Sequence, residues 1–160
     1  MSDEYRKTGV LTEEKLKEVI SKSEFRGRIA IVECVEDIPC DPCVTACPVK
    51  AIKIDNLVGK PELDSEKCTG CGSCIAECPG LAIFVVDFDY SENEAVIMLP
   101  YEFVPVPEEG EIVDVLDRTG EKCGKGEIVK VKIHKNKTAV LSVKVEKELA
   151  MQVRNVRRIV

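Results

Sequence analysis

Hydrophobic and polar residues follow two different periods along this chain of 160 residues. Near the N-terminus, Leu16, Val19 and Ile20 fall on one face of a helix, which Thr12 can cap and which is expected to extend to about Lys22. The later apolar stretches are short and rich in β-branched residues, and most of them alternate with polar residues, a pattern typical of strands. These strands are expected at 28–33, 51–54, 62–63, 82–90, 95–100, 111–117, 126–133, 138–146 and 156–160.

The strands fall into two groups, which a proline-rich stretch separates. Pro100, Pro105 and Pro107 make this stretch a stiff, extended connection. After it come short strands with one helical turn before the last, which predicts a small, partly open barrel of the Src-homology-3-like type. The expected fold class is therefore α+β. Its expected parts are an N-terminal extension with one helix (1–27), a first β-containing domain (28–99), the connection (100–110) and the small barrel (111–160).

Charge is distributed unevenly, although the whole chain has a formal net charge of −6. Residues 1–95 contain 19 acidic and 11 basic side chains, whereas residues 96–160 contain 10 and 12. An acidic N-terminal part argues against nucleic-acid binding and favours docking on a basic surface of a partner protein. No apolar stretch is long enough to predict a membrane span. Abundant cysteine without a preceding secretory signal indicates a cytoplasmic protein.

Eight of the nine cysteines lie in two related runs. The second run has the spacing C-x2-C-x2-C-x3-C and is followed by Pro79. The first run repeats the last three cysteines and the proline at a constant offset of 31 residues, and only Cys34 departs from this offset. The repeat indicates a duplicated metal-binding unit. Its cysteines are Cys34, Cys40, Cys43 and Cys47 in the first run and Cys68, Cys71, Cys74 and Cys78 in the second.

Cysteines at this spacing are typical of loops that hold 4Fe–4S clusters through thiolates. One tight loop can present three sulfur atoms to one cluster, and Gly70 and Gly72 permit the close backbone approach that the second loop needs. Pro48 and Pro79 end the short helical turn that carries each last cysteine. Two all-thiolate zinc sites are the alternative. The triplet spacing and the Cys-Pro endings favour iron.

The rest of the sequence offers no catalytic motif. It contains no nucleophile–base pair, no Walker loop and no dinucleotide-binding glycine motif. Cys123 is expected to be an ordinary turn or strand residue, and His134 a solvated histidine at a hairpin tip. The chain is therefore expected to have no catalytic site of its own and to work by one-electron transfer.

Residues 34–88 resemble the two-cluster bacterial ferredoxins, because both cysteine runs match. In that family the fourth cysteine of each run ligates the other cluster. The resemblance therefore implies two 4Fe–4S clusters with crossed ligands and a ferredoxin-type fold for residues 28–99. The first site, for cluster A, would consist of Cys34, Cys40, Cys43 and Cys78. The second site, for cluster B, would consist of Cys68, Cys71, Cys74 and Cys47.

The whole chain resembles the small iron–sulfur subunit of multi-subunit flavin-dependent dehydrogenases, including proline and hydroxyproline dehydrogenase-like complexes. The segments that carry this resemblance are VECVEDIPCDPC, KCTGCGSCIAECPGLAIFVVD, LPYEFVPVPEEGEIVDVLDR and KELAMQVRN. It implies an electron-transfer subunit of a hetero-oligomeric oxidoreductase complex with flavoprotein dehydrogenase subunits as partners. Two alternatives stay open: a free-standing ferredoxin electron carrier with an extra docking domain, and a protein in which metal only holds the fold.

Overall fold

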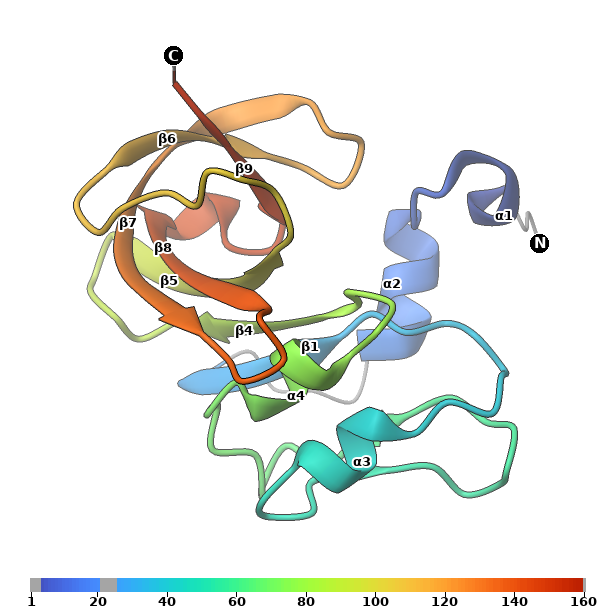
Figure 1. Ribbon diagram of the computed structural model, residues 1–160. Helices are drawn as coiled ribbons and strands as arrows, with labels where there is room; N and C mark the ends of the chain where they lie inside the picture. Colours follow the sequence, from blue (N-terminus) through green and yellow to red (C-terminus); the bar gives the residue numbers. More distant parts are fainter. Residues whose placement is uncertain (1–3, 21–25, 160) are drawn as a thin grey trace.

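The computed structural model describes residues 4–20 and 26–159 and shows a mixed α and β fold in which strands dominate (Figure 1). The helices are α1 (Tyr5–Thr8), α2 (Glu13–Ile20), α3 (Pro42–Ala46), α4 (Ser73–Glu77) and the 3-10 helix η1 (Lys147–Leu149). The strands are β1 (Arg28–Val32), β2 (Ile52–Lys53), β3 (Glu62–Leu63), β4 (Ile83–Asp87), β5 (Glu94–Tyr101), β6 (Ile112–Leu116), β7 (Lys122–Ile133), β8 (Ala139–Glu146) and β9 (Asn155–Arg158).

Every strand expected from the sequence has a counterpart, although the ends differ. The largest difference is β7, which begins at Lys122 rather than at Gly126. The expected end of the N-terminal helix at Lys22 and the expected end of the last strand at Val160 fall outside the described residues.

Seven strands form one antiparallel sheet in the order β1-β4-β5-β8-β7-β6-β9, and β2 and β3 form a separate hairpin. Strand β1 pairs with β4, with Arg28 opposite Asp87, which is the pairing that the duplicated sequence predicts. Strand β5 pairs with β8 over its whole length, from Glu94 to Tyr101. Because β8 belongs to the C-terminal third, the sheet runs without a break from the cysteine-containing part into the region expected to form a barrel.

The expected Src-homology-3-like barrel is not confirmed. Strands β5 to β9 curve around a common core (Figure 1), but the hydrogen bonding of the described residues leaves β9 at an edge and does not close the sheet. Register irregularities in β6, after Val115, and in β7, after Ile128, accompany this curvature, as bulges bend and twist strands. Alternation of apolar residues identifies such strands but cannot show which strand edges will meet.

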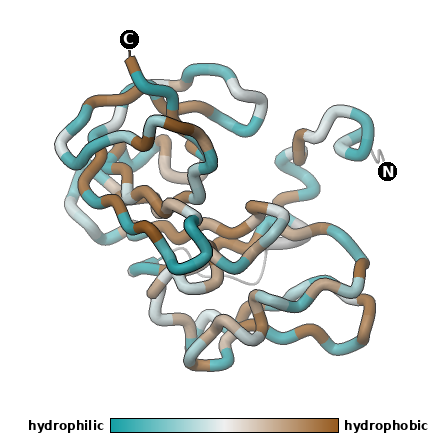
Figure 2. Tube along the Cα trace, viewed as in Figure 1, coloured by the Kyte–Doolittle hydropathy of each residue, from teal (hydrophilic) through white to brown (hydrophobic). Residues whose placement is uncertain are grey.

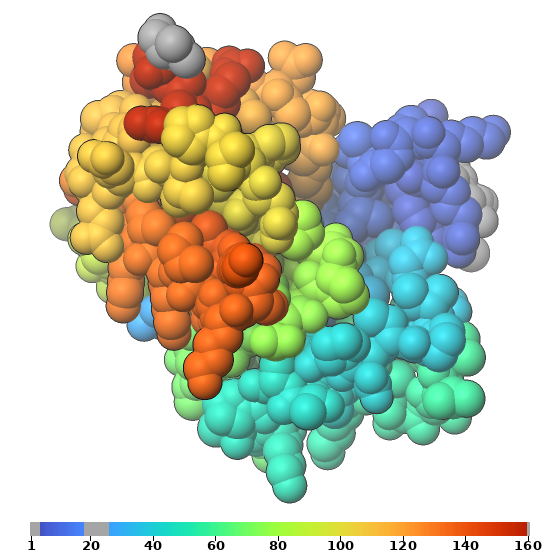
Figure 3. All heavy atoms as spheres, in the orientation of Figure 1, coloured from blue at the N-terminus to red at the C-terminus, as the bar shows by residue number. Residues whose placement is uncertain are grey.

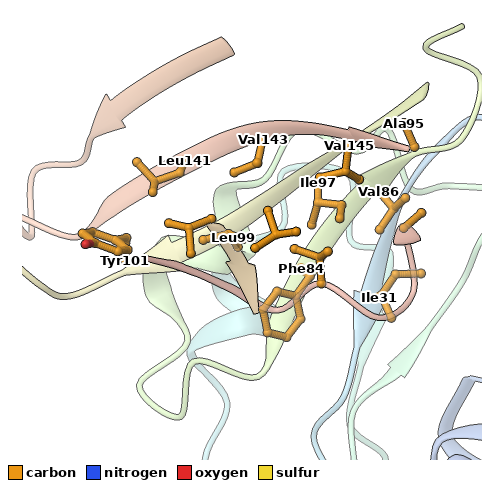
Figure 4. Packing of buried hydrophobic residues seen from close by; sticks show 14 of the residues in the cluster. Ile31, Phe84, Val86, Ala95, Ile97, Leu99, Tyr101, Leu141, Val143 and Val145 are labelled. Atoms are coloured by element: carbon orange, nitrogen blue, oxygen red, sulfur yellow. The ribbon is translucent and has the colours of Figure 1, made fainter. Parts of the chain in front are cut away.

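Strand β4 is buried on both faces, and each face contributes to a different core. Because successive side chains of a strand point to opposite faces, Phe84 joins a large core with β5 and β8 (Figure 4). Val85 joins a smaller core that includes Cys43 and Cys74. Val140 of β8 belongs to the same smaller core. A strand of the C-terminal third therefore packs directly against the cysteine-containing part.

The N-terminal helices pack on the protein itself. Leu16 of α2 is 9 % exposed and belongs to the large core. Thr12 Oγ1 accepts a hydrogen bond of 3.3 Å from the Lys15 N–H, which confirms its expected role as a helix cap. Helix α1 was not expected, because Tyr5 is held by a tertiary contact: its ring is buried and lies 5.8 Å from Lys15 Nζ. No helix in the described part of the chain has the length and hydrophobicity to cross a membrane.

The β7–β8 hairpin forms a further contact with the cysteine-containing part. Figure 3 shows this hairpin in orange, reaching the green and cyan segments. The Asn136 side chain at its turn donates a hydrogen bond of 2.7 Å to the Ala76 carbonyl in α4. Hydrophilic residues occupy the turn, and hydrophobic ones follow along the strands (Figure 2). The C-terminal third thus contacts the cysteine loops through β8 and through this turn.

Candidate iron–sulfur site

Two short helices present the last cysteine of each run in the same backbone conformation. Cys47 is the C-cap of α3, with φ −77° and ψ 111°, and Cys78 is the C-cap of α4, with φ −73° and ψ 111°. A proline follows each cysteine and supplies no N–H to continue the helix. The offset of 31 residues seen in the sequence is therefore a repeat of local structure as well.

The turn after each of these cysteines is also repeated. Lys50 and Leu81 have positive φ angles of 54° and 52°, which is uncommon for residues other than glycine. This conformation directs the next backbone N–H at the cysteine: Ala51 N lies 3.2 Å from Cys47 Sγ. Ala82 N lies 3.4 Å from Cys78 Sγ in the second run. Such hydrogen bonds stabilise a thiolate sulfur, which is the form that binds iron.

The second site is a cavity that four cysteines from both runs line together. Cys47 comes from the first run, and Cys68, Cys71 and Cys74 come from the second. Burial, together with the negative charges of Cys68, Cys71 and Cys47, raises the pKa of Cys74 to about 12. The Ala30 N–H of β1 donates to Cys68 Sγ at 3.4 Å. The rest of the lining is small or apolar: Ala30, Val49, Ala51, Ile52, Leu63, Thr69, Gly70, Gly72 and Val85.

The first site gathers its cysteines in the same crossed way. Burial raises the pKa of Cys43 to about 11, and charges on Cys78, Cys34 and Cys40 contribute to the increase. Burial also raises the pKa of Cys34, and the charges of Cys78 and Cys40 add to this increase. A backbone hydrogen bond at Glu36 acts in the opposite direction. Cys78, from the second run, therefore lies near Cys34 and Cys43 of the first run.

These arrangements fit clusters of iron better than thiols alone. Four thiol groups whose negative forms repel one another need a cationic core between them, and soft sulfur donors suit iron–sulfur clusters. When bound, a 4Fe–4S cluster takes up and releases single electrons. The protein's own contribution is to hold the sulfur atoms, to direct backbone N–H groups at Cys47, Cys68 and Cys78, and to exclude water with apolar side chains.

Among the cysteines of the second site, Cys71 is the most exposed to solvent. Cys71 is exposed, whereas Cys43 and Cys74 are buried and the other five cysteines of the two runs are half-buried. Burial opposes ionisation of Cys71, but hydrogen bonds from the Ser73 side chain and backbone and from Thr69 outweigh it and lower the pKa of Cys71. The Cys71 side of the second site is therefore the place where a cluster would come nearest to another protein.

The two glycines of the second loop allow it to approach other strands closely. Gly70 has φ +68°, and a Cβ there would lie 2.7 Å from the Arg28 carbonyl oxygen of β1. Gly72 has φ +81°, and a Cβ there would lie 2.5 Å from the end of the Met98 side chain in β5. The close approach that these glycines allow in the structure is to strands β1 and β5 of the sheet.

Sequence reasoning missed one group of charged residues beside the first site. Glu33 immediately precedes Cys34, and its carboxylate contacts Arg118 and Arg154. These arginines lie 85 and 121 residues away in the sequence, so no spacing signal could have connected them with the cysteines.

Cys123 and His134 stay outside both sites. Cys123 lies in β7, with Sγ 3.6 Å from the Val115 carbonyl oxygen. His134 is half-buried rather than fully solvated and lines a surface hollow with Pro42, Ser73 and Glu77. Burial, followed by the charge of Lys132, lowers the pKa of His134.

Comparison with known proteins points to the same part of the chain. The family profile of the 4Fe-4S dicluster domain matches residues 20–82. The polyferredoxin-like subunit of an aliphatic sulfonate oxidoreductase from Pyrococcus furiosus is 45 % identical over 47 residues, which cover 29 % of this chain and 27 % of that protein. A subunit of an ion-translocating oxidoreductase complex from Methanosarcina acetivorans is 39 % identical over 66 residues, or 41 % of this chain and 24 % of that protein.

A further relative is an uncharacterized ferredoxin from Methanocaldococcus jannaschii, 46 % identical over 44 residues, with 28 % of each chain covered. The chain thus spans about a quarter of the length of these curated relatives. No solved structure gives a significant match. Together, the profile and these relatives show a ferredoxin-type dicluster domain that carries two 4Fe–4S clusters.

Proposed function

We propose that the protein is the iron–sulfur subunit of a flavin-dependent dehydrogenase complex and relays single electrons through both clusters. In this proposal Cys34, Cys40, Cys43 and Cys78 ligate cluster A, and Cys68, Cys71, Cys74 and Cys47 ligate cluster B. The observation that carries the ligand assignment is the crossed grouping: Cys78 lies with the first run, and Cys47 lies with the second. Helices α3 and α4 also pack against each other, which keeps the two sites adjacent.

The continuous sheet supports a role within a complex. Strands β6 to β9 contribute no cysteine of either run, yet they are joined to the cluster-binding part through the full length of β5 and β8. A rigid connection of this kind fixes the orientation of the clusters relative to whatever the C-terminal third binds. Two of the relatives are named as subunits of oxidoreductases. The inference that the partner is a flavoprotein rests on the resemblance of the whole chain to the small iron–sulfur subunits of flavin-dependent dehydrogenases. A free-standing ferredoxin with an extra docking region is the alternative.

The partner is expected to exchange electrons with cluster B at Cys71. Exposed Cys71, Thr69 and Val49 all line the second site, and Val49 is 39 % exposed. An exposed apolar side chain beside an exposed ligand suits the centre of a protein interface, where truncation of a well-packed side chain costs on the order of 1–2 kcal/mol.

Purification of the tagged chain from cells that naturally produce it tests the proposal. We expect a flavin-containing protein to co-purify, with about eight iron atoms per copy of this chain. Val49→Ser should weaken binding of that partner by about tenfold and leave the iron content unchanged. Val104→Ser is the matched control, because Val104 is 88 % exposed and does not line the second site. A monomer with full iron content and no flavin partner would favour the free-standing carrier instead.

A further inference from the structure

A buried carboxylate stands one residue before the first cluster ligand. Glu33 is 7 % exposed, and its oxygens accept hydrogen bonds from two arginines of the C-terminal third. Arg154 Nε lies 2.8 Å from Oε1, and Arg118 Nε lies 3.2 Å from Oε2. Arg118 Nη2 makes a further contact with Oε1. Paired guanidinium contacts satisfy a buried carboxylate, which would be unfavourable without them.

Both arginines also form hydrogen bonds with the backbone just after η1. Arg154 is 7 % exposed, donates to the Ala150 carbonyl at 3.2 Å, and lies with its guanidinium carbon 4.8 Å from the ring centre of Phe84. Arg118 donates to the Met151 carbonyl at 2.8 Å. Burial, partly offset by the Glu33 carboxylate, lowers the pKa of Arg154 to about 10, so Arg154 stays charged at neutral pH. Two positive charges therefore face one negative charge.

This charged group is connected to two cysteines of the first site. Glu33 is covalently next to Cys34. Its backbone N–H donates to the Ala82 carbonyl at 2.8 Å, and the Ala82 N–H in turn donates to Cys78 Sγ at 3.4 Å. Displacement of Glu33 would therefore move the backbone of both Cys34 and Cys78. In the second site, the contact from β1 is a different one, from Ala30 to Cys68.

We propose that Arg118 and Arg154 are positioning residues for the cluster that Cys34 and Cys78 ligate, and that their excess positive charge raises the reduction potential of that cluster above what the cysteines alone would give. The inference rests on the proposed ligand sets. Reduction adds negative charge to a cluster, so a buried positive charge nearby favours the reduced form. The second cluster lies outside this contact network and serves as an internal reference in the same molecule.

A redox titration of the full-length protein, followed by electron paramagnetic resonance, tests this inference. Cys40→Ser first identifies the signal of the first cluster. Arg154→Met removes a positive charge and should shift the potential of that cluster to a more negative value. Glu33→Gln removes the negative charge, keeps an acceptor for the arginines, and should shift the potential to a more positive value. Arg154→Lys keeps the charge and should restore most of the wild-type potential. The second cluster should be unchanged in all three variants.

Opposite shifts in Arg154→Met and Glu33→Gln separate this inference from a merely structural role. A merely structural role would broaden or abolish the signal of the first cluster in both of these variants. Arg157→Met is the matched control, because Arg157 pairs with Asp114 and its side chain is 59 % exposed. If Arg154→Met does not fold, Arg118→Met removes the less buried guanidinium, whose side chain is 17 % exposed, and should give the same negative shift. Equal shifts in both clusters, shifts of the same sign for Glu33→Gln and Arg154→Met, or no shift would overturn the inference.

The ligand assignment can fail separately. If Cys40→Ser and Cys78→Ser damage different clusters, the crossed sets are wrong. Should Cys34 and Cys78 then prove to ligate different clusters, no single cluster is positioned by this network, and the inference is overturned as well. A wild-type protein that carries both clusters but has no flavin partner would overturn the proposed complex and leave this inference standing.

Discussion

The turns after Cys47 and Cys78 have nearly the same backbone angles, both at the cysteine and three residues later. The strands that follow these turns have different surroundings. In the first run the chain enters β2, which is two residues long and, among the described residues, pairs with β3 alone. In the second run it enters β4, which is five residues long and pairs with β1 on one side and β5 on the other. Equivalent sequences thus lead into a peripheral hairpin in one case and the interior of a seven-stranded sheet in the other.

This difference indicates which half depends more on its metal. An isolated two-stranded hairpin is at best marginally stable in water, whereas a strand with neighbours on both sides is held by its sheet. Cysteine–iron bonds tie distant loops together and can supply the stability that a small hairpin lacks. The first half should therefore be organised by the clusters, and the second half by the sheet.

Removal of the iron should give the largest effect. With the clusters extracted anaerobically, we expect amide protection in α3 and in the β2–β3 hairpin to fall by about 100-fold or more, because these elements have few other contacts. The amides of β4, β5 and β8 should stay protected. Hydrogen exchange followed by mass spectrometry measures both regions in one sample. Equal loss of protection in β4 and β5 would show that the metal organises both halves alike.

Exchange of single ligands is the next most disruptive change. Cys78→Ser should damage the cluster of the first run, and Cys47→Ser should damage that of the second, with loss of about half of the iron in each case. Iron analysis and electron paramagnetic resonance of the two variants provide the measurement. The variants serve as controls for each other, since each cysteine is the C-cap of a five-residue helix and has the same backbone conformation. Damage confined to the variant's own run would contradict crossed ligation.

The smallest expected effect concerns the strained turn that the two runs share. Lys50 is exposed and has φ 54°, so Lys50→Gly relieves a strain of about 1–2 kcal/mol but adds freedom to the unfolded chain worth about 0.4–1 kcal/mol. We expect the thermal midpoint of the cluster-containing protein to rise slightly. Lys53→Gly, on the exposed side of β2, has no such strain to relieve and should lower it. A lower midpoint for Lys50→Gly would mean that the lysine side chain stabilises the folded protein by more than its strained backbone conformation destabilises it.

The sequence by itself determined the local features of this protein. The cysteine spacing and the prolines that follow are patterns among residues that lie close together in the sequence. The duplicated loops, the cluster type and the positions of the strands could therefore be inferred from the sequence. Thr12 as a helix cap and the pairing of β1 with β4 could be inferred for the same reason, since a cap is local and a repeat demands matching strands.

Only the tertiary structure decided how the two parts of the chain are joined. Alternation shows which face of β5 and β8 is apolar, but not that their edges pair with each other. The contacts of Glu33 with Arg118 and Arg154 have no sequence signal at all, because charged residues are mostly exposed and unpaired and burial cannot be read from their identity. The arginines lie 85 and 121 positions after Glu33 in the sequence, and only the folded sheet brings them to the same place. These contacts therefore follow from the fold and could not be used to predict it.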